Sequence, residues 1–223
     1  MKVFIANFGR ENYEWPNCRE RSTVATMNEV DAQRLWDARD REGYITSRMQ
    51  GKTAAGLNPT RSVAARWYNL MTIVSETAGD IWIHRDGDLL WWTTSRDDPP
   101  TFEPKSEPIA RGRDVIVCHK NCEPWANQTR GGTQLLWRSL HPKSRDFLST
   151  EATLRQLSPD YAAYALALIN GSDLEPWHSR SIWTEKNERA STKFSEVRLG
   201  GAKEKAAYRE AAERMATTAD RTV

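Results

Sequence analysis

The feature that most constrains the fold of this chain is a change of hydrophobic spacing within residues 64–95, which read AARWYNLMTIVSETAGDIWIHRDGDLLWWTTS. Apolar side chains first recur every three or four residues, as on the buried face of a helix. Gly79 ends this pattern, because glycine accepts the left-handed conformation that closes a helix. A strand-like spacing follows, interrupted by a turn at Asp86, Gly87 and Asp88. The segment therefore predicts a helix and then a β-hairpin with strands at 81–84 and 89–94.

Tryptophan is unusually frequent, with ten residues against five phenylalanines and six tyrosines. Four of the ten lie in or beside the predicted hairpin, at Trp67, Trp82, Trp91 and Trp92. A core rich in aromatic rings is one explanation, because each indole buries a large area. The other is that some rings form flat walls for a nucleobase or a sugar, since stacking contributes about 1–3 kcal/mol per base.

Composition indicates one core domain with an appended segment, which we place at 1–171 and 172–223 of the 223 residues. No run approaches the roughly 18 apolar residues of a membrane span. The first six residues are apolar but too few for a signal peptide, so we expect a cytoplasmic protein. A formal net charge of +2 does not by itself indicate a nucleic-acid partner, so any basic surface must be local. The oligomeric state is not predicted.

The rest of the sequence predicts an α+β fold. Prolines within residues 96–113 predict a loop, because proline cannot donate a hydrogen bond to a sheet. Gly43 is predicted to end a helix. Strands are predicted at 1–6, 114–119 and 135–137, and further helices at 28–38, 158–169 and 202–217.

Two polar segments are candidates for binding. Residues 7–17 have the composition of a loop but carry several aromatic and asparagine residues, of which Asn12 could pair with a base edge and Tyr13 or Trp15 could stack. The alternative is an ordinary turn with an indole beneath it. The second segment, residues 48–61, and the helix after it carry a run of cations without an acid: Arg48, Lys52, Arg61 and Arg66. These cations would suit phosphates, and the alternative is that they are solvated surface charges.

Chemistry at the predicted hairpin would involve its acids and its histidine. Trp82 and His84 share one face of a strand, beside the turn acid Asp86 and close to Glu76. An acid or base that positions water, next to a ring that holds a base or sugar, suits hydrolysis at a sugar carbon. The alternative is that the acids only form a good turn.

No metal or cofactor is predicted. Cys118, His119 and Cys122 lie close in sequence, and Cys18 could join them, but their spacing is not that of common zinc sites. Buried free thiols are the favoured interpretation. The sequence also contains no GxSxG, HExxH or P-loop motif.

The order of strand, polar aromatic loop, helix and hairpin resembles the PUA-like superfamily, in particular its EVE, YTH and ASCH domains. Gly79 and Asp80 stand before the first hairpin strand as in those families, and residues 157–160 look like the start of their closing helix. The resemblance implies a small β-barrel with flanking helices and a pocket for a modified base. It also implies that the tryptophans at 67, 82, 91 and 92 wall that pocket.

Residues 56–59, Gly-Leu-Asn-Pro, are similar to the first motif of uracil-DNA glycosylases, and His141 with Pro142 to their second. Thr60 departs from the first motif, where glycine is usual. This similarity implies that Asn58 positions a water molecule and that His141 supports the leaving base.

The combined prediction is a protein that flips a modified base of DNA into a tryptophan-lined pocket and hydrolyses its N-glycosidic bond, in defence against phage DNA. The defence role comes from the resemblance alone. Two alternatives stay open, namely a non-catalytic reader of the same base and a protein that binds or processes sugars, because tryptophan also stacks on hexoses.

Overall fold

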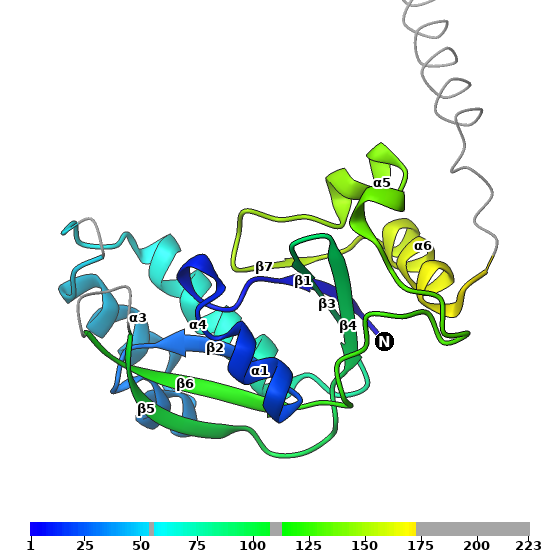
Figure 1. Ribbon diagram of the computed structural model, residues 1–223. Coiled ribbons are helices and arrows are strands. Elements are labelled where there is room, and N and C mark those ends of the chain that lie inside the picture. Colours follow the sequence, from blue (N-terminus) through cyan, green and yellow to red (C-terminus); the bar gives the residue numbers. More distant parts are fainter. Residues whose placement is uncertain (54–55, 108–112, 173–223) are drawn as a thin grey trace, which may run out of the picture. The chain divides into compact units, whose positions relative to one another are not determined.

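The computed structural model of the chain describes residues 1–53, 56–107 and 113–172 (Figure 1). The chain divides into two compact units, Met1–Leu174 and Glu175–Val223. The helix predicted at 202–217 belongs to the second unit and lies outside the described residues. The first unit has the α+β composition that the sequence predicts, with helices and two separate sheets.

The first sheet contains the predicted hairpin and the N-terminal strand. Its order is β4-β3-β1-β7, with β1 parallel to β3 and the other neighbours antiparallel. The hairpin is confirmed, because its two strands pair from Ile81 with Thr94 to Asp86 with Leu89. The strands are β1 (Val3–Ala6), β3 (Ile81–Asp86), β4 (Leu89–Thr94) and β7 (Leu154–Gln156).

The second sheet has the order β2-β6-β5, with antiparallel neighbours: β2 (Thr23–Asn28), β6 (Arg113–Asn121) and β5 (Thr101–Glu107). The central strand β6 confirms the strand predicted at 114–119. The loop predicted at 96–113 is wrong, since β5 includes Pro104. An edge strand accepts proline because the outward N–H of such a strand has no ladder partner to lose.

The helices follow their start signals more closely than their predicted ends. Thr60 begins α4 by accepting a hydrogen bond from the Val63 amide at 3.4 Å, and Asp40 begins α3 by accepting one from the Gly43 amide at 2.8 Å. Gly43 thus lies inside a helix rather than ending one. The helices are α1 (Trp15–Arg21), α2 (Ala32–Asp37), α3 (Arg41–Gln50), α4 (Arg61–Glu76), α5 (Pro142–Phe147) and α6 (Pro159–Asn170), with short 3₁₀ turns at Arg10–Asn12 and Trp137–Ser139.

Two other predictions change at these bounds. The helix predicted at 28–38 is shorter, because Asn28 is the last residue of β2 and α2 begins only at Ala32. The strand predicted at 135–137 is replaced by the 3₁₀ turn that begins at Trp137. The helix predicted at 158–169 is confirmed as α6.

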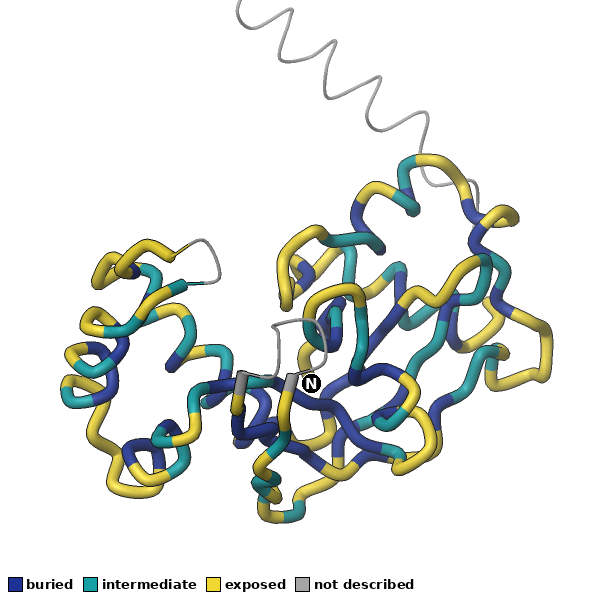
Figure 2. Tube along the Cα trace, turned by 60° about the vertical axis from the view of Figure 1, so that its left-hand side comes forward, coloured by how far each residue is buried: buried dark blue, intermediate teal, exposed yellow. Residues whose placement is uncertain are grey.

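Strand β6 separates two apolar cores. Val115 and Val117 pack with Phe4 and Trp82 of the first sheet, whereas Ile116 packs with Tyr44, Tyr68 and Met71 of α3 and α4. Alternate residues of one strand thus serve opposite sides, as the two-residue period of a strand requires. Buried residues, dark blue in Figure 2, lie mainly along these strands and on the facing sides of the helices.

The strands of the described residues form two sheets and no closed barrel. Backbone hydrogen bonds link the two sheets where Ser95 and Cys122 form a bridge and the Arg96 amide donates to the Asn121 carbonyl at 2.9 Å. None of the helices in the described part of the chain is long and apolar enough to cross a membrane.

Candidate functional site

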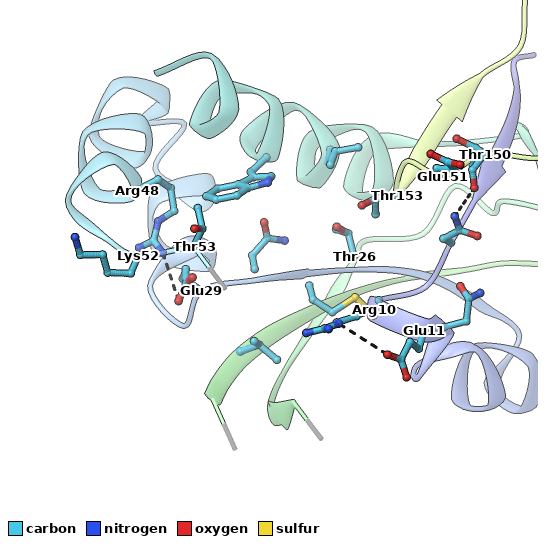
Figure 3. Close-up of a pocket in the computed structure, with 18 of the residues that line it drawn as sticks. Arg10, Glu11, Thr26, Glu29, Arg48, Lys52, Thr53, Thr150, Glu151 and Thr153 are labelled. Carbon is cyan, nitrogen blue, oxygen red and sulfur yellow. Dashed lines mark hydrogen bonds and ion pairs between the residues drawn. The ribbon is translucent and has the colours of Figure 1, made fainter. Parts of the chain in front are cut away.

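A candidate site for ligand binding is a pocket of about 750 Å³ (Figure 3). That volume lies within the roughly 300–1,000 Å³ of small-molecule and cofactor sites. The pocket is lined by β2, α3, α4, the loop after β1 and the segment before β7. Its lining includes Asn7, Gly9, Arg10, Glu11, Asn12, Thr26, Met27, Asn28, Glu29, Tyr44, Arg48, Lys52, Thr53, Trp67, Leu70, Val115, Thr150, Glu151 and Thr153.

Regular spacing within each element brings these side chains to the pocket. Thr26 and Asn28 are two residues apart on β2 and so point to the same side of the sheet. Tyr44 and Arg48 are four apart on α3, and Trp67 lies three before Leu70 on α4. Residues at these helical spacings share a face. One polar strand face and two helix faces therefore meet around one space.

An amide and a phenol form the buried wall of the pocket. The Tyr44 hydroxyl donates a hydrogen bond to Oδ1 of Asn28 at 3.2 Å. Burial raises the pKa of Tyr44, so its hydroxyl stays protonated and keeps this donor role. Asn28 is only 8% exposed, and its Nδ2 has no hydrogen-bond partner among the residues that the structure describes.

Arg48 lies beside this wall and is held by acids. Its guanidinium donates to Oδ1 of Asp31 at 2.5 Å and to the Ser47 hydroxyl at 3.0 Å. It also lies 3.6 Å from Glu29 (Figure 3). Its Nε has no partner within the described ranges. The predicted role of Arg48 in binding phosphate is therefore corrected, because two carboxylates already neutralise it.

Charges around the pocket balance. Arg10 lies 3.9 Å from Glu11, and Lys52 donates to Oδ1 of Asn58. The pocket lining holds three cations and three acids, namely Arg10, Arg48 and Lys52 with Glu11, Glu29 and Glu151. A balanced lining favours a neutral polar ligand over a free phosphate, which would require an excess of donors and positive charge.

Comparison with family models, curated proteins and solved structures finds no match for this chain.

The pocket brings together four of the predicted site residues, namely Asn12, Arg48, Lys52 and Trp67. Trp67 is half-buried, and it is the only tryptophan among the described residues that line this pocket. Oδ1 of Asn12 accepts a hydrogen bond from the Phe8 amide at 2.9 Å, which fixes this loop side chain at the edge of the pocket. Tyr13 is half-buried next to Gly9, outside the lining.

Trp82 belongs to the core rather than to the pocket. It is 1% exposed, its ring lies 4.7 Å from that of Phe4, and its Nε1 donates to the Thr77 hydroxyl at 3.1 Å. The predicted role of Trp82 as a base-binding wall is therefore corrected, because both its faces and its polar atom are occupied by the protein.

Trp15, His84 and Asp86 form a separate cluster. The Trp15 and His84 rings are 4.2 Å apart, and Trp15 Nε1 donates to a carboxylate oxygen of Asp86 at 3.0 Å. His84 is 1% exposed and its Nδ1 pairs with the Ala6 carbonyl at 2.9 Å. These positions do not support the predicted catalytic roles of His84 and Asp86, because neither side chain lines the pocket and the imidazole has no access to solvent.

Trp91 and Trp92 are neighbours on β4 and so point to opposite faces of the sheet. The guanidinium of Arg19 lies over Trp91, 5.4 Å from the ring centre. Trp92 donates from Nε1 to the Gln128 carbonyl at 2.8 Å, and Arg130 lies over its ring. Neither lines the pocket, and opposite faces prevent them from forming one wall.

The other predicted residues lie outside the pocket as well. Asn58 donates to the Met49 carbonyl at 3.0 Å, and His141 caps α5 by accepting from the Lys143 amide at 3.3 Å. Glu76 pairs with Arg39 and Arg61 with Glu42, each at 2.5 Å. Arg66 is exposed on α4. The structure thus gives Asn58 and Glu76 structural partners and does not place them beside a common ligand.

The cysteines are buried and free. Burial raises the pKa of Cys118 to about 11 and that of Cys122 to about 12, so both thiols stay protonated at neutral pH. Within the described residues no group of three or more histidines, cysteines or acids could hold a metal ion. These contacts agree with the interpretation of buried thiols.

The sequence analysis missed the pocket residues that lie on β2 and on the buried face of α3, above all Asn28 and Tyr44. The only local signal was the four-residue spacing of Tyr44 and Arg48, which indicates a shared helix face. No local pattern marks Asn28, because the phenol that holds its amide comes from a different element.

Acidification should destabilise the protein through two buried histidines. Burial lowers the pKa of both His84 and His119 from 6.5, although nearby acids oppose this shift. The unfolded chain then binds more protons than the folded one, so the free energy of unfolding is expected to fall as the pH drops below about 6.5. Each histidine contributes at most about 1.4 kcal/mol per pH unit.

Urea unfolding between pH 7.5 and 5.5 would measure this dependence, with the H84Q variant as the comparison. Glutamine keeps a donor for the Ala6 carbonyl but does not titrate, so the variant should show a visibly shallower pH dependence than the wild type. Identical slopes for the two proteins would contradict the assignment of His84 as a buried neutral imidazole.

Proposed function

We propose that this protein binds a nucleobase turned out of DNA in the pocket and recognises it without breaking its glycosidic bond. The observation that carries the proposal is the combination of one accessible indole, Trp67, with the buried Asn28, whose Nδ2 has no hydrogen-bond partner among the described residues, in a charge-balanced pocket. A flat wall suits a ring, the amide suits the edge of that ring, and the balance of charge suits a neutral heterocycle.

The volume and the energetics agree with one nucleotide unit as the ligand. About 750 Å³ accommodates a base with part of its sugar. Extruding a base costs a few kcal/mol, which stacking on Trp67 and hydrogen bonds in the pocket can offset. Lys52 and Arg66 are exposed cations on the helical side of the unit, where they would be available to the DNA backbone.

The PUA-like fold is part of the same proposal. We infer that the two sheets are an opened form of that barrel, joined where Ser95 bridges Cys122. The edge strands away from this junction are β2, β5 and β7, and the pocket takes residues from β2 and from the segment that precedes β7. A ligand there would occupy the opening. Modified bases, such as those of phage DNA, are the ligands that the resemblance implies.

A reader is preferred over a glycosylase because of where the predicted chemical groups lie. Asn58, Glu76, His84 and Asp86 are all absent from the pocket lining. Of the three acids that do line it, Glu11 and Glu29 lie beside Arg10 and Arg48. These two carboxylates therefore already have a guanidinium group as a partner.

Fluorescence anisotropy tests the proposal with labelled duplexes that carry one unpaired base or one abasic site. We expect at least a tenfold preference for the base-bearing duplex, with the DNA intact after incubation and alkali. Equal affinity for the two duplexes, or no binding, would overturn the proposal. Alkali-labile strands would instead establish a glycosylase and make E151Q the first variant to assay. Competition by free glucose but not by DNA would indicate a sugar-binding protein.

A further inference from the structure

We infer that the pocket selects a base whose inserted edge carries hydrogen-bond acceptors, and that Asn28 is the residue that determines this specificity. The inference rests on the proposed function and names the class of base that the same pocket takes. In natural DNA the matching edges are N3 with O2 of cytosine and N7 with O6 of guanine.

The first observation is the unpartnered donor. Asn28 lines the pocket, the residue is 8% exposed, and its Nδ2, which is buried from solvent, has no acceptor among the described residues. Buried polar groups are nearly always paired, and leaving one unpaired is costly. A ligand acceptor is the partner that the pocket itself offers space for.

The second observation is what fixes the direction of the amide. The Tyr44 hydroxyl donates to Oδ1 of Asn28 at 3.2 Å, so the oxygen is occupied and the nitrogen is the atom left for a ligand. Tyr44 is 1% exposed and packs among the residues of the second core, including Tyr68 at 5.2 Å between ring centres. A phenol held this tightly prevents the amide from presenting its oxygen instead.

The third observation is a second donor in the same lining. Arg48 is 8% exposed, its terminal nitrogens are engaged by Asp31, Ser47 and Glu29, and its Nε has no partner in the described part of the chain. Because those contacts hold the guanidinium in place, Nε is a fixed donor. Its guanidinium carbon lies 5.7 Å from the centre of the Tyr44 ring, which connects it to the phenol that orients Asn28.

Two donors in one wall select against a base that presents a donor there. Adenine offers an N–H beside its acceptor on each hydrogen-bonding edge, and thymine offers an N–H between its two carbonyl groups. Cytosine and guanine each have one edge with two adjacent acceptors. The pocket should therefore rank cytosine or guanine above adenine and thymine.

The test is a binding panel in which one unpaired position of a labelled duplex carries cytosine, guanine, adenine, thymine, difluorotoluene or no base. Difluorotoluene has the shape of thymine but hardly accepts hydrogen bonds. Wild-type protein should bind cytosine or guanine about tenfold or more tightly than difluorotoluene, and adenine and thymine should fall between.

Variants at the wall complete the test. N28D keeps an oxygen for the Tyr44 hydroxyl but replaces the donor by an acceptor, so it should lose the preference over difluorotoluene. N69D makes the same amide-to-carboxylate change at an exposed residue of α4 that does not line the pocket, so it is the matched control and should keep that preference. Thermal unfolding of each variant shows that it is folded, and the wild-type panel decides the question if N28D does not fold.

The possible failures are distinguishable. Wild-type protein that binds difluorotoluene as tightly as cytosine and guanine, while rejecting the abasic duplex, overturns this inference and leaves the proposed function standing. Equal affinity for all four natural bases also overturns the inference. Equal affinity for the abasic duplex overturns the proposed function and this inference with it.

Discussion

The W67A variant is expected to bind base-bearing DNA about 5- to 150-fold more weakly than the wild type, which corresponds to about 1–3 kcal/mol of stacking energy. Trp67 is the one tryptophan placed in the pocket lining, and alanine removes the flat surface on which a base would lie. Anisotropy titrations with the unpaired-base duplex measure the loss. W67F keeps a smaller ring and should lie between the two.

A matched control separates this effect from the general loss of an aromatic residue. Trp92 is also half-buried, but it lies on β4 outside the pocket. W92A should therefore bind with wild-type affinity. Because Trp67 also packs against the second core, each variant needs a melting temperature above the assay temperature. Equal losses of affinity in W67A and W92A would argue against the pocket as the binding site.

The W82A variant is expected to lose about 3–5 kcal/mol of the free energy of unfolding, the usual cost of removing a large aromatic side chain from a core. Trp82 is 1% exposed and packs against Phe4, and Nε1 donates to Thr77. Alanine leaves a cavity between the two sheets and removes one hydrogen bond to the Thr77 hydroxyl, which keeps its contacts with Asp80 and Ser95. Urea unfolding of wild type and W82A measures the difference.

W82F distinguishes a core residue from a wall of the binding site. Phenylalanine fills most of the space but cannot donate to Thr77, so stability should fall by less than in W82A. Affinity for the unpaired base should stay at the wild-type value. A W82F protein that is as stable as the wild type but binds the base more weakly would indicate that Trp82 contacts the base rather than only the core.

Local spacing predicted the elements whose signals are contained in one segment. The helix from Arg61 and the hairpin of β3 and β4 follow directly from a change of period around Gly79. Strand β5 could not be found this way, because Pro104 is acceptable only at the edge of a sheet, and its position at an edge is a property of the whole sheet. Strand β2 was missed because Thr23, Thr26 and Asn28 gave it a weak apolar signal.

The pocket was harder to predict than the fold because its parts come from distant segments. Trp67 and Trp82 are equally compatible with a core or a wall, and only the packing of Phe4 on Trp82 separates them. Arg48 looked like a phosphate ligand in a run without acids, yet Asp31 from another element neutralises it. Asn28 gains its significance only through Tyr44, sixteen residues away.

The position of β1 in the first sheet has a consequence for synthesis of the chain. β1 is translated before both of its neighbours, β3 and β7, so Val3 can pair with Ile81 and Ala6 with Leu154 only after those strands have been made. Folding that depends on such distant pairs is slow compared with helix formation. The apolar strand Val3–Ala6 therefore stays without its sheet partners while most of the unit is being made, and is the segment on which a chaperone that binds nascent chains would act.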